Sequence, residues 1–286
     1  FLWDRRIVDV PRWLWWFILN GIILRFRPRR IAKLYQSIWT PDGSPLMAFS
    51  QRLAARLEQE LNECTGQPIP VHLAMTYGEP GLDQLGKLMR RHGQCPVVVV
   101  PLFPQYSSST TAAVFDGLAN QLRRCPDVPD MRFVRNYYKE DTYIEALARS
   151  VEHHWQHYPR GEKLLFSFHG IPESYQQKGD PYPVECAETA RLVAARLNLS
   201  DDQYMVSFQS RFGRQEWVKP YTDVLIENWA REGIRHIDVI CPGFATDCLE
   251  TLEEIAIQNK ERFIEHGGKT FNYIPCLNDS PDHARA

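Results

Sequence analysis

A chain of 286 residues, 44% of them hydrophobic and 24% charged, can bury a sizeable core in one large domain or in two of about 140 residues. Its 33 basic residues are balanced by 35 acidic ones, and the net charge of −2 leaves no electrostatic footprint for nucleic acid, so we expect no nucleic-acid partner. The seven cysteines are widely spaced without a CxxC pair, which predicts free thiols in a reducing cytoplasm and no zinc or iron–sulfur site.

An apolar, tryptophan-rich run near the start of the chain covers residues 13–24, and arginines flank it on both sides. It is interrupted by Asn20 and Gly21 and is shorter than the about 20 apolar residues that a membrane-spanning helix needs. The flanking arginines also exclude a signal peptide. Two interpretations remain: an ordinary buried helix, or an amphipathic lip that lines a binding cleft or touches a membrane surface, where tryptophan and arginine are favoured.

The rest of the chain alternates short β-branched or apolar runs with longer segments of helical period, a pattern typical of parallel strands joined by helices. We expect strands at residues 69–75, 96–102, 131–135, 163–168, 203–208, 235–240 and 270–274. We expect helices at residues 45–63, 80–91, 109–124, 140–157, 184–197, 219–232 and 249–266. The run of valines at 97–100 shows no alternation, so its strand should be central and covered on both faces.

These elements divide near residues 158–162. The predicted fold is therefore α/β, with two similar doubly wound, Rossmann-like parallel-sheet halves. The N-terminal half, residues 1–158, would carry the apolar run as a lip, and the C-terminal half would cover residues 159–286. Ligands of such sheets bind beyond the carboxyl ends of the strands, so a cleft between the halves is the natural site.

A histidine leaves one of these predicted strands. In the loop SFHGIP, residues 167–172, His169 follows the strand and Gly170 lets the backbone turn. A functional histidine at the carboxyl end of a strand fits this placement, and so does a histidine that is only hydrogen-bonded within its loop.

Carboxylates gather in the segment ATDCLETLEE, residues 245–254. On an α-helix, Asp247, Glu250 and Glu254 would fall within about 100° of arc and form one acidic ridge. An acidic helix start that complements the helix dipole explains the same residues. Imidazole and carboxylates facing each other across a cleft would suit proton transfer or the binding of a divalent metal such as iron.

Hydroxyl side chains fill a third loop, FPQYSSSTT at residues 103–111, which opens a helix after the valine strand. Hydroxyls and free backbone N–H groups at a helix start can hold a carboxylate or phosphate, although plain helix capping explains them as well. The GxSxG, P-loop and GxGxxG motifs do not occur, which disfavours the common hydrolases, phosphoryl-transfer enzymes and dinucleotide-binding proteins.

Taken together, LLFSFHGIPESY, KGDPYPVEC, SFQSRFGRQEWVKP and CPGFATDCLETLEE resemble the ferrochelatase family, enzymes that insert ferrous iron into a porphyrin. The resemblance also includes PQYSSSTT, GSPL at residues 43–46 and the apolar run, and it is to the bacterial type that makes protoheme. It implies a chelatase-like fold with a porphyrin cleft between the halves. Members usually begin with a further strand and a glycine-containing loop, so we expect that this chain lacks its first strand.

The resemblance also assigns the site. It places the catalytic and metal-binding roles on His169 and Glu250, with Asp247 and Glu254 as a relay. It implies porphyrin contacts at Trp13, Leu14, Tyr106, Ser108, Trp217 and Phe244, and it matches the GDPYP loop to residues 179–183. Ferrous iron would be a substrate, with no prosthetic group and no iron–sulfur cluster. The expected location is the cytoplasm, with peripheral membrane contact left open.

Two alternatives stay open. A chelatase of the same fold could act on coproporphyrin or sirohydrochlorin, with iron or cobalt as the metal. A porphyrin or haem carrier would share the apolar cleft but perform no chemistry.

Overall fold

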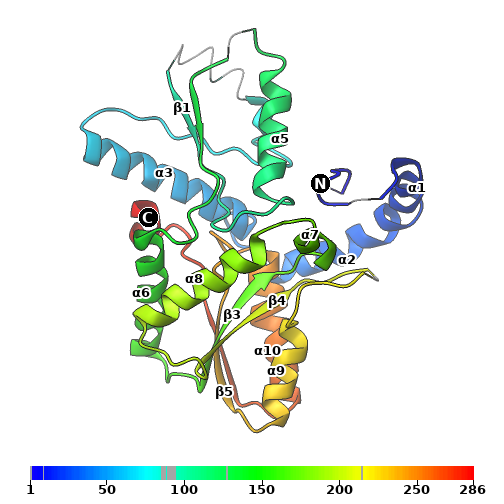
Figure 1. Ribbon diagram of the computed structural model, residues 1–286, viewed down its shortest axis with the longest axis vertical. Helices are drawn as coiled ribbons and strands as arrows, with labels where there is room; N and C mark the ends of the chain where they lie inside the picture. The colour runs from blue at the N-terminus through cyan, green and yellow to red at the C-terminus, as the bar shows by residue number, and fades with distance from the viewer. Residues whose placement is uncertain (1, 9, 85–87, 89–94, 127, 214) are drawn as a thin grey trace.

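The computed structural model describes residues 2–8, 10–84, 88, 95–126, 128–213 and 215–286 (Figure 1). In Figure 1 the C-terminal sheet and its helices occupy the lower part of the molecule, and the N-terminal strands lie above them with helix α5 (Thr111–Leu122). Within the described ranges, no helix has the length and apolarity that crossing a membrane would require.

Four parallel strands form the C-terminal sheet: β3 (Lys163–His169), β4 (Tyr204–Gln209), β5 (His236–Ile240) and β6 (Thr270–Ile274). Their order across the sheet is β4-β3-β5-β6, so β3 lies between β4 and β5. The predicted α/β class with parallel strands is confirmed, and each of these strands lies where the sequence predicted it.

Alternate side chains of β3 enter two different cores, as the two-residue period of a strand requires. Leu164, Phe166 and Phe168 join the core under helices α6 (Asp141–His157) and α8 (Tyr182–Arg196). Leu165 joins the core on the opposite face, under α9 (Thr222–Arg231) and α10 (Lys260–Glu265). Because helices cover both faces, β3 reads as a nearly continuous apolar run in the sequence.

Helix α6 ends before the predicted division at residues 158–162, yet its Tyr143 and Val151 are buried in the same core as Phe166 of β3. The polypeptide therefore crosses onto the C-terminal sheet before the predicted boundary. The division into residues 1–158 and 159–286 stays a prediction.

The N-terminal half contains a shorter parallel pair, β1 (Val97–Val99) and β2 (Met131–Phe133), with helices α3 (Pro45–Thr65) and α5 beside it. The prediction that the valine strand is covered on both faces is wrong, because Val98 is 61% exposed and Val100 46% exposed. Within the described residues this sheet has two strands, so β1 lies at an edge of it and the predicted central position is wrong as well.

The strand expected at residues 69–75 is also wrong. This segment has no strand geometry apart from an isolated bridge between Met75 and Gly81. The backbone N–H groups of Ile69 and Val71 donate to Asn62 and Glu58 of α3 instead of to a neighbouring strand. Pro70 has no N–H to donate, and Pro68 precedes the segment, so the sequence itself weakens a strand here.

Of the helix expected at residues 80–91, the structure describes residues 80–84, which include the 3₁₀ turn η2 (Leu82–Gln84), and residue 88, while 85–87 and 89–91 fall outside the described residues. The expected helix at 249–266 is divided. Its first part is the π-helix η3 (Glu250–Asn259) and its second part is α10. Two further short helices, α7 (Glu173–Gln177) and α11 (Pro281–Arg285), were not predicted.

The apolar N-terminal run lies in a continuous helical segment composed of α1 (Arg12–Ile18), the π-turn η1 (Leu19–Ile23) and α2 (Leu24–Ile38). In Figure 1 it extends from the centre of the molecule to its right edge. The buried-helix interpretation fails for most of the run: Trp15 and Leu19 are buried, but the exposed apolar side chains include Trp13, Trp16, Phe17, Ile22 and Leu24. A helix with this much exposed apolar surface has the amphipathic character of the second interpretation.

Candidate functional site

The order of the C-terminal strands fixes where a ligand would bind. After β3 the chain continues to β4 on one side, and after β4 it crosses to β5 on the other side of β3. In an open parallel sheet this reversal is the topological switch point, and the crevice outside the carboxyl ends of the two central strands receives the ligand. His169 ends β3, and Cys241 to Phe244 follow β5, so the histidine loop and the acidic segment meet there.

His169 is partly buried, and its Nδ1 lies 2.7 Å from the backbone oxygen of Gly170. If Nδ1 carries the proton it donates this hydrogen bond, which leaves Nε2 as a lone pair for a proton or a metal ion. Gly170 is sterically required, because a Cβ there would lie 2.9 Å from the Gln209 oxygen and 3.2 Å from Cε3 of Trp217. The ring of Phe244 lies 6.5 Å from the His169 ring.

Glu254 faces this histidine. Its carboxylate accepts hydrogen bonds from the Ser210 backbone N–H at 2.8 Å and from the Ser210 hydroxyl. Burial raises the pKa of Glu254, with the hydrogen bonds of Ser210 and the charge of His169 opposing the shift and the charge of Glu250 adding to it. A desolvated carboxylate within electrostatic reach of an imidazole is suited to exchange protons with it.

Glu250 stands at the first position of η3 and is half-buried. Its charge adds to the effect of burial in raising the pKa of Tyr35 on α2 and of Cys248. Helix α2 therefore reaches the acidic segment, and Tyr35 is a neighbour of the site that the sequence did not reveal. Tyr35 and Glu250 are far apart in the sequence, so no local sequence pattern links them.

Asp247 does not join Glu250 and Glu254 in one ridge. Its side chain is buried and accepts hydrogen bonds from the Thr251 hydroxyl at 2.9 Å, the Asn278 amide at 2.7 Å and the hydroxyl of Tyr273. The predicted ridge assumed one α-helix through all three residues, whereas Asp247 lies before the helical residues and η3, which has the i→i+5 pattern of a π-helix, begins only at Glu250. Its Gln258 accordingly bonds to Glu253, five residues earlier.

The described residues contain no group of three or more histidine, cysteine, aspartate or glutamate side chains that could hold a metal ion. His169, Glu250 and Glu254 are therefore brought into electrostatic contact without forming a closed coordination cage.

A buried chain of hydrogen bonds connects β3 and β4 to the first residue of η3. The Ser167 hydroxyl donates to Oε1 of Gln209 at 2.7 Å, and Nε2 of Gln209 donates to the Glu250 backbone oxygen at 2.9 Å. The same Ser167 hydroxyl lies 2.9 Å from the Thr222 hydroxyl of α9. This chain fixes the orientation of the Gln209 amide towards η3, and sequence reasoning missed it because its members lie on four different elements.

The hydroxyl loop does hold carboxylates, but they belong to the chain itself. Ser108 donates from its backbone N–H and its hydroxyl to Asp180 Oδ2, both at 2.7 Å. The backbone N–H of Tyr106 donates to Glu185 at 2.7 Å, and the guanidinium of Arg135 lies 4.1 Å from the centre of the Tyr106 ring. The donors that were expected to hold a carboxylate or phosphate ligand therefore already bind a carboxylate of the protein, because both donors of Ser108 are taken by Asp180.

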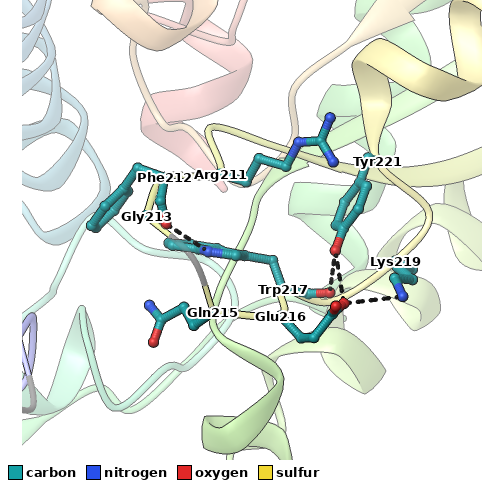
Figure 2. Close-up of a pocket in the computed structure, with 8 residues that line it drawn as sticks. All are labelled: Arg211, Phe212, Gly213, Gln215, Glu216, Trp217, Lys219 and Tyr221. Carbon is teal, nitrogen blue, oxygen red and sulfur yellow. Dashed lines mark hydrogen bonds and ion pairs between the residues drawn. The ribbon is translucent and has the colours of Figure 1, made fainter.

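Trp217 lies between the histidine loop and a surface pocket. It is 5% exposed, its Nε1 donates to the Phe212 oxygen at 3.0 Å, and Gly170 is packed against its ring. Figure 2 shows the pocket, of about 550 Å³, which is lined by Arg211, Phe212, Gly213, Gln215, Glu216, Trp217, Lys219 and Tyr221. Trp217 is thus close to His169 but largely covered. Trp13 is 69% exposed and Leu14 39% exposed on α1, and their contact with a porphyrin stays a prediction.

A parallel α/β sheet with a histidine and carboxylates at its switch point defines the class of the protein as a chelatase-like α/β protein. SirB from Bacillus subtilis, solved with Fe³⁺, is similar in fold, with a TM-score of 0.58 and 14% identity over 85% of this chain and 88% of SirB.

The sequence matches the ferrochelatase family over residues 1–286. It is 51% identical to ferrochelatase 1 of Shewanella oneidensis, over 99% of this chain and 85% of that protein. It is 52% identical to the ferrochelatase of Vibrio cholerae, over 99% of this chain and 87% of that protein. The chain belongs to the ferrochelatase family, and the family predicted from the sequence motifs is confirmed.

Proposed function

We propose that the chain is an enzyme that inserts ferrous iron into protoporphyrin IX to form protoheme. The observation that carries this proposal is the meeting of His169 with Glu250 and Glu254 beyond the carboxyl end of β3. Its near relatives are named ferrochelatases, and the site has the open imidazole and carboxylate groups that the reaction requires.

Metal insertion requires two pyrrole N–H protons to leave while the nitrogen lone pairs meet the ion. His169, with Nδ1 directed to the Gly170 oxygen, accepts a pyrrole proton at Nε2 or contacts the incoming iron there. Glu250 acts from η3 as the second proton acceptor or metal contact. Glu254, whose pKa is raised by burial, passes protons between the histidine and the solvent.

The structure favours a different role for Asp247 than the predicted relay. Its oxygens are occupied by donors from Thr251, Tyr273 and Asn278. We therefore assign Asp247 to holding the segment that leads into η3, and we assign the relay to Glu254 alone.

The porphyrin would be held mainly by apolar and aromatic contacts. Phe244 and Trp217 lie beside His169, and Tyr106 with Ser108 would contact the macrocycle from the N-terminal half. Trp13 and Leu14 would guide an insoluble substrate into the site from the exposed face of α1. The same face would rest on a membrane surface, with the protein otherwise in the cytoplasm.

An anaerobic assay with ferrous iron and a panel of tetrapyrroles tests the proposal. We expect the Soret band of protoporphyrin IX to convert to that of haem with multiple turnovers. Binding of porphyrin without turnover would establish the carrier instead. A clear preference for coproporphyrin or sirohydrochlorin, or for cobalt over iron, would establish one of the related chelatases.

A further inference from the structure

We infer that Asp180 and Glu185 are positioning residues that fix the 105–108 loop of the N-terminal half against the C-terminal half, and thereby set the affinity for porphyrin. The inference rests on the proposed function, because Tyr106 and Ser108 of this loop are the predicted porphyrin contacts. Both acidic residues act through the loop and do not contact the reacting atoms.

Four consecutive residues of the loop are tied to one short stretch of the C-terminal half. The Gln105 amide donates to the Thr189 hydroxyl at 2.9 Å, and the Tyr106 N–H donates to Glu185 at 2.7 Å. The next two residues bind Asp180: the Ser107 hydroxyl donates at 3.0 Å, and the N–H and hydroxyl of Ser108 each donate at 2.7 Å. All of the acceptors lie on α8 or in the loop directly before it.

Asp180 is 8% exposed and Glu185 5% exposed. A buried carboxylate is costly unless donors satisfy it, so these two are held by their hydrogen bonds. Three bonds from the 105–108 loop converge on Oδ2 of Asp180, and Oδ1 accepts from the Tyr182 N–H at 3.0 Å. Glu185 accepts from Asn136 at 2.9 Å and pairs with Arg135 at 3.2 Å.

Arg135 extends this arrangement to the aromatic ring of the loop. Its guanidinium pairs with Glu185 and lies 4.1 Å from the centre of the Tyr106 ring. Glu185 therefore fixes both the backbone of Tyr106, through its N–H, and the cation beside its ring. The loop should consequently keep one conformation when no porphyrin is bound, which lowers the conformational cost of binding.

The substitutions Asp180→Asn and Glu185→Gln test the inference without changing side-chain volume. An amide has only one acceptor oxygen, so in Asp180→Asn the NH₂ group must face either the Ser108 donors or the Tyr182 N–H. We expect the Kd for protoporphyrin, measured by tryptophan fluorescence quenching without metal, and the KM for porphyrin each to rise about tenfold, the equivalent of one hydrogen bond. The kcat at saturating porphyrin should stay within about threefold of wild type.

Glu188→Gln is the matched control, because Glu188 is a partly exposed carboxylate on the same helix, and its ion pair with Arg191 spans one turn without reaching the 105–108 loop. Its Kd and KM should equal those of the wild type. Ser107→Ala, which removes the hydroxyl that donates to Asp180, should raise the Kd less than Asp180→Asn, and the double variant should show less than the sum of the two effects, because both changes break the same contact.

The result that would overturn the inference is an unchanged porphyrin Kd in folded Asp180→Asn and Glu185→Gln, even if their Tm falls. A fall in kcat with unchanged KM would also overturn it, since that would place the two residues in the chemical step. If Asp180→Asn does not fold, Ser107→Ala decides by the same measurements, because Ser107 binds Asp180 and is not a predicted porphyrin contact. Failure of the proposed function is distinguishable, because the wild type would then bind porphyrin but form no haem.

Discussion

Glu250→Gln separates a chemical role of the acidic segment from a structural one. The substitution keeps the shape of the side chain and removes its charge. The hydrogen bond that Gln209 donates to residue 250 ends on the backbone oxygen, so it persists in the variant. The hydrogen bond between Gln209 and η3 is therefore the same in the wild type and the variant, and the change is confined to the carboxylate.

The effects expected from a structural role and from a chemical role of Glu250 differ enough in size to distinguish the two roles. As a negative charge in the first turn of a helix, Glu250 contributes about 0.3–1 kcal/mol to stability, so the Tm should fall by no more than about 4 °C. As a proton acceptor or metal contact, it should contribute at least about 10²-fold to turnover, which corresponds to about 2.7 kcal/mol of the activation free energy. The chemical effect is thus several times larger than the structural one.

The assay compares haem formation under saturating substrates with thermal unfolding of the same preparations. Glu253 is not a suitable control, because it is buried and accepts both short hydrogen bonds of the Gln258 amide. Glu261 on α10 is exposed, and Glu261→Gln should leave both turnover and Tm unchanged. Small and equal effects of Glu250→Gln and Glu261→Gln on turnover would refute the catalytic assignment.

His169→Ala should reduce turnover by at least about 10²-fold while the porphyrin Kd stays close to wild type, since the apolar contacts remain; wild-type turnover would remove the histidine from the mechanism. Glu254→Gln should flatten the dependence of stability on pH. Burial raises the folded-state pKa of Glu254, so the folded wild type binds this proton more tightly than the unfolded chain, and its free energy of unfolding falls as pH rises from 4.5 through the raised pKa. Denaturant unfolding at several pH values checks this, and identical curves for both proteins would contradict it. Replacing Trp13 and Trp16 with serine should raise the KM for porphyrin and weaken vesicle binding with little change in kcat or Tm, because both side chains are exposed; a large loss of Tm alone would contradict the predicted lip.

The C-terminal sheet was predictable because its strands are buried on both faces. Residues such as Leu164, Leu165 and Phe166 must all be apolar whichever side they face, so the run is visible without knowledge of the partners. The segment at 69–75 has a similar composition, but α3 takes its backbone N–H groups through Asn62 and Glu58. These acceptors lie 7 and 13 residues earlier in the chain, so the apolar pattern of the segment alone does not contain them, although Pro70 already weakens the strand.

The site was predictable in its residue types and less so in its geometry. His169, Glu250 and Glu254 were named from the sequence, and the structure brings them into electrostatic contact. Asp247 was placed with them because a helix was assumed to begin before it, whereas η3 begins at Glu250 and Asp247 lies ahead of the helical residues. The ends of a helix are the least certain part of a sequence-based assignment, so the error falls on the one residue of the three that lies outside the helix.

The carboxylates near the candidate site differ in their hydrogen bonds, and burial raises the pKa of Glu254. Asp180, Glu185 and Asp247 each accept hydrogen bonds from at least three fixed donors, so their lone pairs are committed within the protein. An incoming proton or metal ion would have to displace those donors, and buried donors left without acceptors carry a cost of about 1–3 kcal/mol each. Glu254 also accepts three hydrogen bonds, from the N–H and hydroxyl of Ser210 and, at 3.5 Å, from the Gln209 amide, but burial raises its pKa, so it binds a proton more readily than an exposed glutamate does. We therefore propose the chemistry for Glu250 and Glu254, and we assign Asp180, Glu185 and Asp247 to the framework around them.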